Sequence, residues 1–186
     1  NVTLADTVAN SLTGSLGRQA GESVGNYAYT LGSLGLASGN ASGNYRLAIN
    51  LAGAQETITQ ANLTVTVTGQ NTSKVYGTND QVLPYTTSGV INTTVRSYDA
   101  SGNVVNVTVD DTGTGVMSGN LGRQSGENVG NYALTLGSLN FTNHNYALVL
   151  NPVGANETIT AANLTVNASN ATKTYGTNDP TLGYTT

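Results

Sequence analysis

Oxygen-bearing side chains gather in a polar stretch near the middle of the sequence and form a candidate metal site. They are Asp99, Asn103, Asp110 and Asp111. Carboxylate and amide oxygens are ligands that Ca²⁺ accepts in flexible geometry. The alternative is that these residues belong to tight turns. We favour the turns, because an aligned copy of the segment has Ala5 where Asp110 stands and keeps only Asp6.

Catalytic chemistry has few side chains available. The 186 residues include one histidine, His144, and no cysteine. A hydrolase triad needs a base beside its nucleophile, and a transition-metal site needs several His or Cys ligands. His144 falls in a polar loop whose aligned copy, residues 35–44, has no histidine. We therefore expect no enzyme, no catalytic residue and no cofactor.

The charge content excludes other partners. Charged residues make up only 9% of the chain, against about 25% in an average globular protein. The net charge is −4, and there is no run of basic residues to neutralise a phosphate backbone or an anionic membrane surface. No apolar run approaches the ~18 residues of a membrane span. We expect neither nucleic-acid binding nor membrane insertion.

Acceptor sequences for asparagine-linked glycosylation are about twice as frequent as chance placement predicts. The acceptors are Asn1, Asn40, Asn62, Asn71, Asn92, Asn106, Asn140, Asn156, Asn163, Asn167 and Asn170. A half-buried strand with an outward Asn also produces Asn-apolar-Thr triplets, so a purely structural explanation exists. The same geometry exposes Asn62, Asn92, Asn106 and Asn163. Because charges are scarce, we predict that sugars on such asparagines keep the surface soluble.

Two copies of the motif Gly-Arg-Gln-x-Gly-Glu hold several of the charges. They place Arg18 near Glu22 and Arg123 near Glu127. We expect an ion pair within each loop and not a ligand site, and such a pair contributes little when exposed.

Tyrosine supplies ten of the eleven aromatic residues. Tyr27 and Tyr132 each precede an alternating segment, which favours a corner with the ring in the core and the hydroxyl on the backbone. Four further tyrosines offer either a sugar-stacking face or packing between modules, and we favour packing. They are Tyr76, Tyr85, Tyr175 and Tyr184.

The sequence contains an internal duplication. Residues 14–34 match residues 119–139 at 17 of 21 positions, at an offset of 105 that falls to 101 and then 99 further along. The repeat of about 100 residues divides the chain into residues 1–60, the later part of a first repeat; residues 61–161, a complete second repeat; and residues 162–186, the start of a third. Repeats of this length are typically separate modules with their own cores.

Apolar and polar residues alternate in residues 63–68, 105–109 and 132–136, with the period of two that indicates strands. Residues 99–103 suit a hairpin turn. We predict an all-β chain of tandem Ig-like or related β-sandwich modules, with equivalent core positions at Val24/Val129, Tyr27/Tyr132, Leu31/Leu136 and Leu34/Leu139. No Pro-, Gly- or Ser-rich hinge interrupts residues 55–68, so we expect modules joined end to end into a rod.

Three motifs each occur twice along the chain: Lys-x-Tyr-Gly-Thr-Asn-Asp, then Gly-Asn-Tyr-Ala-x-Thr-Leu-Gly-Ser-Leu, then a closing Glu-Thr-Ile-Thr. This pattern resembles the MBG modules of the YGX type, which repeat in large secreted bacterial adhesins and filamentous-haemagglutinin-like exoproteins. The resemblance implies a β module at the cell surface without a catalytic site. Residues 91–117 are longer than such a module requires, and we predict an inserted hairpin there.

The favoured hypothesis is a glycosylated structural stalk within a larger extracellular protein, either a bacterial cell-surface adhesin or a fibre of a matrix or biofilm. Its partners would be neighbouring repeats of the same chain. A second hypothesis is an adhesive module that binds glycans or a host or matrix receptor through tyrosines and Asn/Asp loops. A third is a subunit of a homopolymeric filament built by strand exchange, because low-charge strand edges invite pairing.

Overall fold

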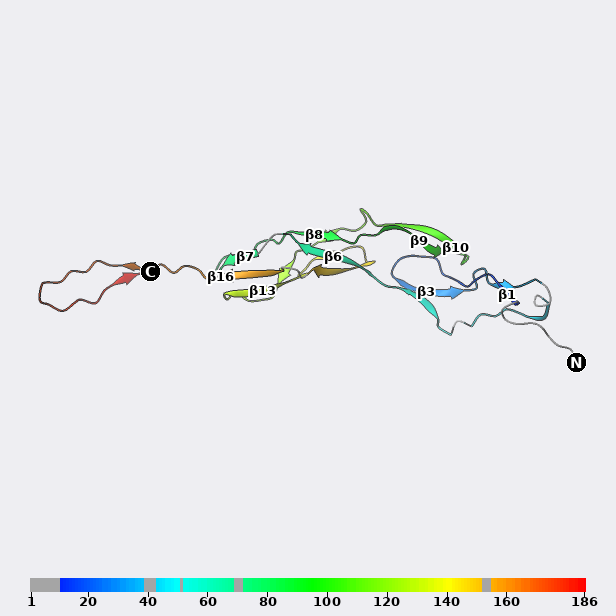
Figure 1. The fold of residues 1–186 in the computed structure, drawn as a ribbon, viewed down its shortest axis with the longest axis horizontal. Coiled ribbons are helices and arrows are strands. Elements are labelled where there is room, and N and C mark those ends of the chain that lie inside the picture. The colour runs from blue at the N-terminus through cyan, green and yellow to red at the C-terminus, as the bar shows by residue number, and fades with distance from the viewer. Residues whose placement is uncertain (1–10, 39–42, 51, 69–71, 152–154) are drawn as a thin grey trace.

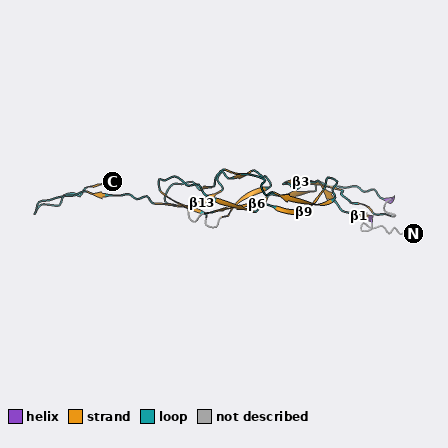
Figure 2. Ribbon diagram, turned by 90° about the horizontal axis from the view of Figure 1, so that it is seen from above, coloured by secondary structure: helices purple, strands orange, loops and turns teal. Residues whose placement is uncertain are grey.

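The computed structural model describes residues 11–38, 43–50, 52–68, 72–151 and 155–186 and shows an all-β chain. Its elements follow one another along a long axis (Figure 1), and the ribbon is thin when seen from above (Figure 2). Among the described residues, no helix is long and apolar enough to cross a membrane. The strands fall into several small sheets that follow the repeats.

The second repeat contains two main sheets. One has the strand order β12 (Gly122–Arg123), β13 (Gly130–Thr135), β16 (Asn156–Thr160), β7 (Thr72–Val75). The other has the order β15 (Tyr146–Asn151), β6 (Ala61–Val67), β8 (Tyr85–Ser88). The strands β11 (Met117–Ser118) and β14 (Asn140–Phe141) form a separate short pair. In both main sheets, strands from the start of the repeat therefore pair with strands from its end.

Two of these pairings are parallel, β15 with β6 and β16 with β7. An Ig-like sandwich is antiparallel, so the Ig-like form of the prediction does not describe this topology. The parallel pairs arise because β6 and β7, from the start of the repeat, lie beside β15 and β16, from its end. A long connection lets the two strands of each pair run in the same direction. The related-sandwich form of the prediction is consistent with the two sheets.

The first repeat shows the same pattern where its sequence is duplicated. Its sheet has the order β2 (Gly17–Arg18), β3 (Gly25–Thr30), β5 (Gln55–Ile58), and β1 (Leu12–Thr13) pairs with β4 (Gly35–Leu36). Tyr27 lies opposite Glu56, as Tyr132 lies opposite Glu157. The predicted structural equivalence of the two copies is confirmed for these strands.

A long hairpin separates the two halves of the second repeat. Strands β9 (Asn92–Tyr98) and β10 (Val104–Asp110) pair over seven positions. The turn at residues 99–103 is held by Asp99, whose Oδ1 accepts hydrogen bonds from the backbone N–H groups of Ser101 and Asn103 at 2.9 and 2.8 Å. The predicted hairpin and its turn are both confirmed. Figure 1 shows this hairpin above β3 of the first repeat.

The third repeat begins with a short hairpin. Strands β17 (Asn167–Ala168) and β18 (Tyr184–Thr185) pair in the register Asn167↔Thr185. This corresponds to the register Thr66↔Thr86 between β6 and β8. The start of the third repeat thus repeats the early pairing of the second.

Among the residues that the structure describes, the buried apolar side chains lie in the second repeat. They are Leu63, Val65, Leu83, Leu121, Leu134, Leu139, Tyr146 and Ile159. The prediction that Val24 and Val129 are core positions is wrong, since they are 39% and 60% exposed. Both valines precede their strands, in the loop that follows the Arg motif, so the alternating pattern does not reach them.

The other predicted core pairs differ between copies. Leu139 is buried and Leu136 is partly buried against the core, whereas Leu34 is only half-buried and Leu31 is exposed. Residues 1–60 contain no copy of residues 61–88, which supply β6, β7 and β8. Without those strands, the same leucines have less apolar surface to contact.

Candidate functional site at the junction of two repeats

A cluster of five charged residues lies in the second repeat. It contains Lys74 on β7, Asp80 in the loop that follows, Arg123 on β12, Glu127 in the next loop and Glu157 on β16. Arg123 Nη2 lies 2.9 Å from Asp80 and 2.5 Å from Glu127, and its Nε lies 2.5 Å from Glu157. Lys74 Nζ lies 2.5 Å from both Asp80 and Glu127. The Lys-x-Tyr-Gly-Thr-Asn-Asp motif thus meets the Gly-Arg-Gln-x-Gly-Glu motif.

The Arg123 side chain also fixes the shape of its own loop. Its Nη1 donates hydrogen bonds to the carbonyl oxygens of Gln124 (3.1 Å) and Gly126 (2.5 Å), and its guanidinium lies 4.9 Å from the ring centre of Tyr132. The Tyr132 hydroxyl donates to the Asn128 carbonyl at 2.8 Å. A Cβ on Gly126 (φ +143°) would lie 2.4 Å from the Tyr132 ring, so glycine is required there.

Tyr27 repeats this arrangement in the first repeat, with its hydroxyl on the Ser23 carbonyl at 2.7 Å. The predicted hydroxyl–backbone bonds of Tyr27 and Tyr132 are confirmed. Their rings are half-buried beside arginine and not within the apolar core, which corrects that part of the prediction.

Acidification is expected to weaken the second repeat through Asp80 and Glu127. Hydrogen bonds from Arg123 and, to a smaller extent, from Lys74 lower the pKa of Asp80. Hydrogen bonds from Lys74 and, to a smaller extent, from Arg123 lower the pKa of Glu127. A carboxyl with a lowered pKa in the folded state stabilises it above the unfolded-state pKa, and this contribution is lost as the pH falls through the folded-state pKa. The ordinary values are 3.8 and 4.5. Stability should therefore change little through these groups above about pH 5 and decline below about pH 4.

Urea unfolding at about pH 7, 5 and 3 measures this loss. The Asp80→Asn variant should lose less stability between pH 5 and 3 than the unmodified chain, because one of the two titrating carboxyls is gone. An equal loss in both would show that the cluster does not carry the pH dependence.

In the first repeat, the equivalent arginine contacts residues of its own repeat and of the next. Arg18 Nη2 lies 2.6 Å from Glu22, and Arg18 Nε lies 3.2 Å from Glu56, a charge contact outside hydrogen-bond geometry. Residues 1–58 contain no counterpart of Lys74 or Asp80. The predicted pairs Arg18–Glu22 and Arg123–Glu127 are confirmed, but each arginine also contacts groups distant in the sequence.

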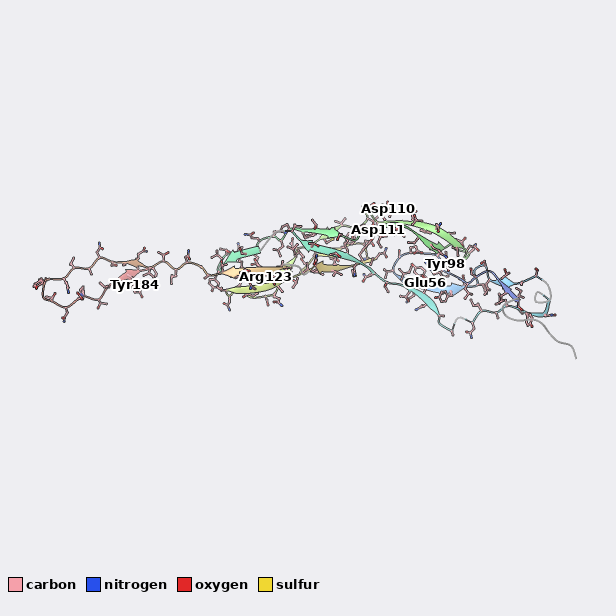
Figure 3. The ribbon with its side chains drawn as sticks, in the orientation of Figure 1. Glu56, Tyr98, Asp110, Asp111, Arg123 and Tyr184 are labelled. Carbon is pink, nitrogen blue, oxygen red and sulfur yellow. The ribbon has the colours of Figure 1, made fainter. Side chains whose placement is uncertain are left out.

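The hairpin β9–β10 supplies contacts to Arg18 and Glu22 from the second repeat. The hydroxyl of buried Ser97 donates a hydrogen bond to Glu22 Oε1. The ring centre of Tyr98 lies 5.5 Å from the Arg18 guanidinium, which also lies 4.8 Å from Tyr27. Figure 3 shows Tyr98 on the hairpin above Glu56 of the first repeat. Arg18 is therefore held between tyrosines of two successive repeats, a cation–π arrangement.

The backbones of the two repeats also approach closely. A Cβ placed on Gly17 would lie 2.2 Å from the carbonyl oxygen of Gly102 in the hairpin turn, so only glycine fits at this position of β2. A second contact lies nearer the link between the repeats. There the Asn145 side chain accepts a hydrogen bond from the Val24 N–H at 2.9 Å, and Gln60 donates to the His144 carbonyl at 3.0 Å.

These interactions form the junction site, which we define as Gly17, Arg18, Glu22 and Val24 of the first repeat with Ser97, Tyr98, Gly102 and Asn145 of the second. Sequence reasoning singled out Arg18 and Glu22 and missed the residues of the second repeat. Ser97 and Gly102 lack recognisable counterparts in residues 1–60, so the duplication carried no signal for them.

The four candidate calcium ligands do not come together. Asp99 and Asn103 lie at the turn of the hairpin, and Asp110 lies at its other end, opposite Asn92. Asp110 Oδ1 accepts hydrogen bonds from Thr112, and Asp111 Oδ2 accepts one from the Tyr146 hydroxyl at 2.8 Å. Figure 3 shows Asp110 and Asp111 well away from Tyr98. Within the described ranges, no three acidic, His or Cys side chains are placed to hold a metal ion.

Every acceptor asparagine that the structure describes has an exposed side chain: Asn62, Asn92, Asn106, Asn140, Asn156, Asn163, Asn167 and Asn170. Asn1, Asn40 and Asn71 lie outside the described residues. His144 is exposed in the loop between β14 and β15. Of the four tyrosines considered for sugar stacking, Tyr85 packs against the core, while Tyr76, Tyr175 and Tyr184 are exposed.

Comparison with protein families gives one match, to the MBG domain (YGX type), over residues 63–154. This range runs from β6 to β15 and includes Lys74, Asp80, Arg123 and Glu127 of the charged cluster. Neither the curated proteins nor the solved structures contain a match to the chain.

Proposed function

Residues 63–154 belong to the MBG domain family of the YGX type, a repeat module of cell-surface proteins, and we propose that the chain is a structural stalk segment of a bacterial adhesin or extracellular fibre. Its repeats follow one another end to end and hold a binding region away from the cell. No chemical step is involved, since the function is mechanical.

The junction site is the observation that carries this proposal. Only Thr59 and Gln60 separate β5 of the first repeat from β6 of the second, too few residues for a flexible linker. The hairpin β9–β10 then returns over the first repeat and contacts Arg18, Glu22 and the backbone of Gly17. A short link and a second, distant contact together restrict bending, which a stalk requires.

We further propose that sugars cover the exposed acceptor asparagines. Among the described residues, strand β10 pairs with β9 alone and contains no charged side chain before Asp110, although charges on strand edges normally prevent sideways association. Asn106 on β10 is exposed and positioned to carry a hydrophilic glycan instead, and Asn62 on β6 is exposed as well. Glycopeptide mass spectrometry of natively produced protein should find hexose-containing modifications on them; unmodified asparagine at all eight described positions would refute this part of the proposal.

Electron microscopy of tandem arrays tests the stalk function. Chains with one, two and four copies of residues 61–160 should form straight particles whose length grows in proportion to the number of copies, because each hairpin restrains the preceding repeat. A flexible chain of beads would instead show an end-to-end distance that grows with about the square root of the number of repeats. That second result would exclude a stiff stalk.

A further inference from the structure

The two parallel pairings of the second repeat share one register. Strand β15 pairs with β6 over six positions, and β16 pairs with β7 over four positions. Partners in both pairings are 85 residues apart, as residue 61 is from residue 146 and residue 72 is from residue 157. The strands β6 and β7 therefore form one line of a parallel ladder, and β15 and β16 form the other.

The chain enters the repeat at one end of this ladder and leaves it at the other. It enters β6 at Ala61 and leaves β16 after Thr160. In Figure 1, the chain reaches β6 from the side of β3 and continues beyond β16 to the C-terminal end. Tension along the chain therefore pulls β6 by its N-terminal end and β16 by its C-terminal end. Because the paired strands are parallel, these pulls draw the two lines past each other and load their hydrogen bonds together.

Further hydrogen bonds lie at both ends of the ladder. At the entry, the Ala61 N–H donates to the Asn145 carbonyl at 2.9 Å. At the exit, the Tyr76 N–H donates to the Thr160 carbonyl at 2.8 Å, and the Thr160 hydroxyl donates to the Lys74 carbonyl at 3.2 Å. Each line is thus bonded to the other at the point where the chain enters or leaves the repeat.

Buried side chains shield the ladder from water. Leu63 and Val65 of β6 and Ile159 of β16 are at most 1% exposed. Leu148 and Leu150 of β15, which pair with Leu63 and Val65, are partly buried against the core. A backbone hydrogen bond that is stretched in such surroundings has no water molecule at hand to replace its partner, so breaking it costs more than in an exposed strand.

We propose that the strands β6, β7, β15 and β16 form a force-bearing clamp, which keeps the second repeat folded when the chain is pulled along its length. A stalk that holds a binding region away from a cell experiences such tension whenever the bound partner moves. The biological role of the clamp rests on the stalk proposal, whereas the mechanical resistance is a property of the second repeat alone.

Single-molecule force spectroscopy of the full chain tests the clamp by pulling in two directions. The chain has no cysteine, so handles can be attached at introduced ones. Thr59→Cys with Ala161→Cys applies tension along the chain, whereas Thr59→Cys with His144→Cys pulls apart the adjacent N-terminal ends of β6 and β15. All three positions are exposed. At the same constant force, the repeat should stay folded at least about tenfold longer in the first direction, because two hydrogen bonds that break together already give this factor.

Equal lifetimes in the two directions would overturn the proposal. Handles at residues 59 and 161 bypass the first repeat and the junction site. A flexible junction, which would refute the stalk, therefore leaves this measurement unchanged, and a failed clamp leaves the junction stiff.

Tyr76→Pro tests the exit end of the clamp. The Thr78 N–H donates to the Val75 carbonyl, and Gly77 has a φ of +85°, as in a type II turn, whose second position accepts proline. The substitution therefore keeps the turn but removes the N–H that bonds to Thr160. Under tension along the chain, Tyr76→Pro should unfold about fivefold faster than Tyr76→Ala, which loses the same exposed ring but keeps the N–H. Equal unfolding rates of the two variants would contradict the clamp.

Discussion

Replacing Leu63 with Ala is expected to destabilise the second repeat by about 3 kcal/mol, within the usual range for emptying a buried leucine site. Leu63 is 1% exposed on β6, the central strand between β15 and β8. Removing three carbons there leaves a cavity that the neighbouring strands, fixed by their hydrogen bonds on both sides, cannot readily close. Urea unfolding followed by circular dichroism measures the change.

Leu164 provides the matched control, because it occupies the same place in the same Asn-Leu-Thr-Val sequence and is 80% exposed. Leu164→Ala should leave the unfolding midpoint unchanged. Equal effects of the two substitutions would mean that residues 61–67 are not the centre of the folded module.

Replacing Arg123 with Met is expected to cost about 3 kcal/mol, the lower end of the range for removing one partner of a buried ion pair. The main loss comes from Glu157, which is 3% exposed and would be left without the guanidinium that lies 2.5 Å away. Asp80 and Glu127 are at least half exposed, so water compensates for most of their lost attraction. The loop carbonyls of Gln124 and Gly126 also lose a donor.

Arg96→Met is the control, since Arg96 is exposed on the hairpin. It should change the free energy of unfolding by no more than about 0.5 kcal/mol. If Arg123→Met proved as mild as Arg96→Met, the charged cluster would not be a stabilising element of the module. Adding the Glu157→Gln substitution to Arg123→Met should recover part of the loss, because the buried charge is then removed as well.

Local features of the fold were predictable because the alternation of polar and apolar residues and the residue preferences of turns depend on neighbouring positions in the sequence. Alternation located β6, β10 and β13 to within two residues at each end, and the Asp-Ala-Ser-Gly-Asn segment located the hairpin turn. The excess length of residues 91–117 indicated the hairpin itself. The ion pairs Arg18–Glu22 and Arg123–Glu127 were also predictable, since each lies within one loop.

Pairing between distant strands was not predictable from the same patterns. Residues 62–65 and 163–166 have the same sequence, yet the first lie in a buried central strand and the second are exposed. Residues 45–50 share three of six residues with residues 146–151, yet they form no strand, whereas residues 146–151 form β15. The available partner decides the outcome, and strand propensity reflects packing with neighbours more than it reflects the backbone.

The charged cluster and the junction site depend on this long-range pairing. Lys74 meets Glu127 only because β7 lies beside β16, and Ser97 meets Glu22 only because the hairpin lies on the first repeat. The alternation of polar and apolar residues along a strand does not reveal which other repeat the strand contacts. The mistaken core positions Val24 and Val129 show a related limit, because a conserved spacing between copies does not establish burial.

The stiffness of the junction can be measured by electron–electron double resonance between spin labels at Thr13→Cys and Ser118→Cys, which are equivalent, exposed positions of the two repeats. A stiff junction predicts a narrow distance distribution. Gly17→Ala should broaden it, because the new Cβ would lie 2.2 Å from the Gly102 carbonyl oxygen and displace the hairpin. Gly122→Ala, whose nearest neighbours would be 3.2 Å away, should leave it narrow. A broad distribution in the parent double-cysteine chain, or no difference between the two glycine variants, would contradict the account of the repeats as a rigid stalk.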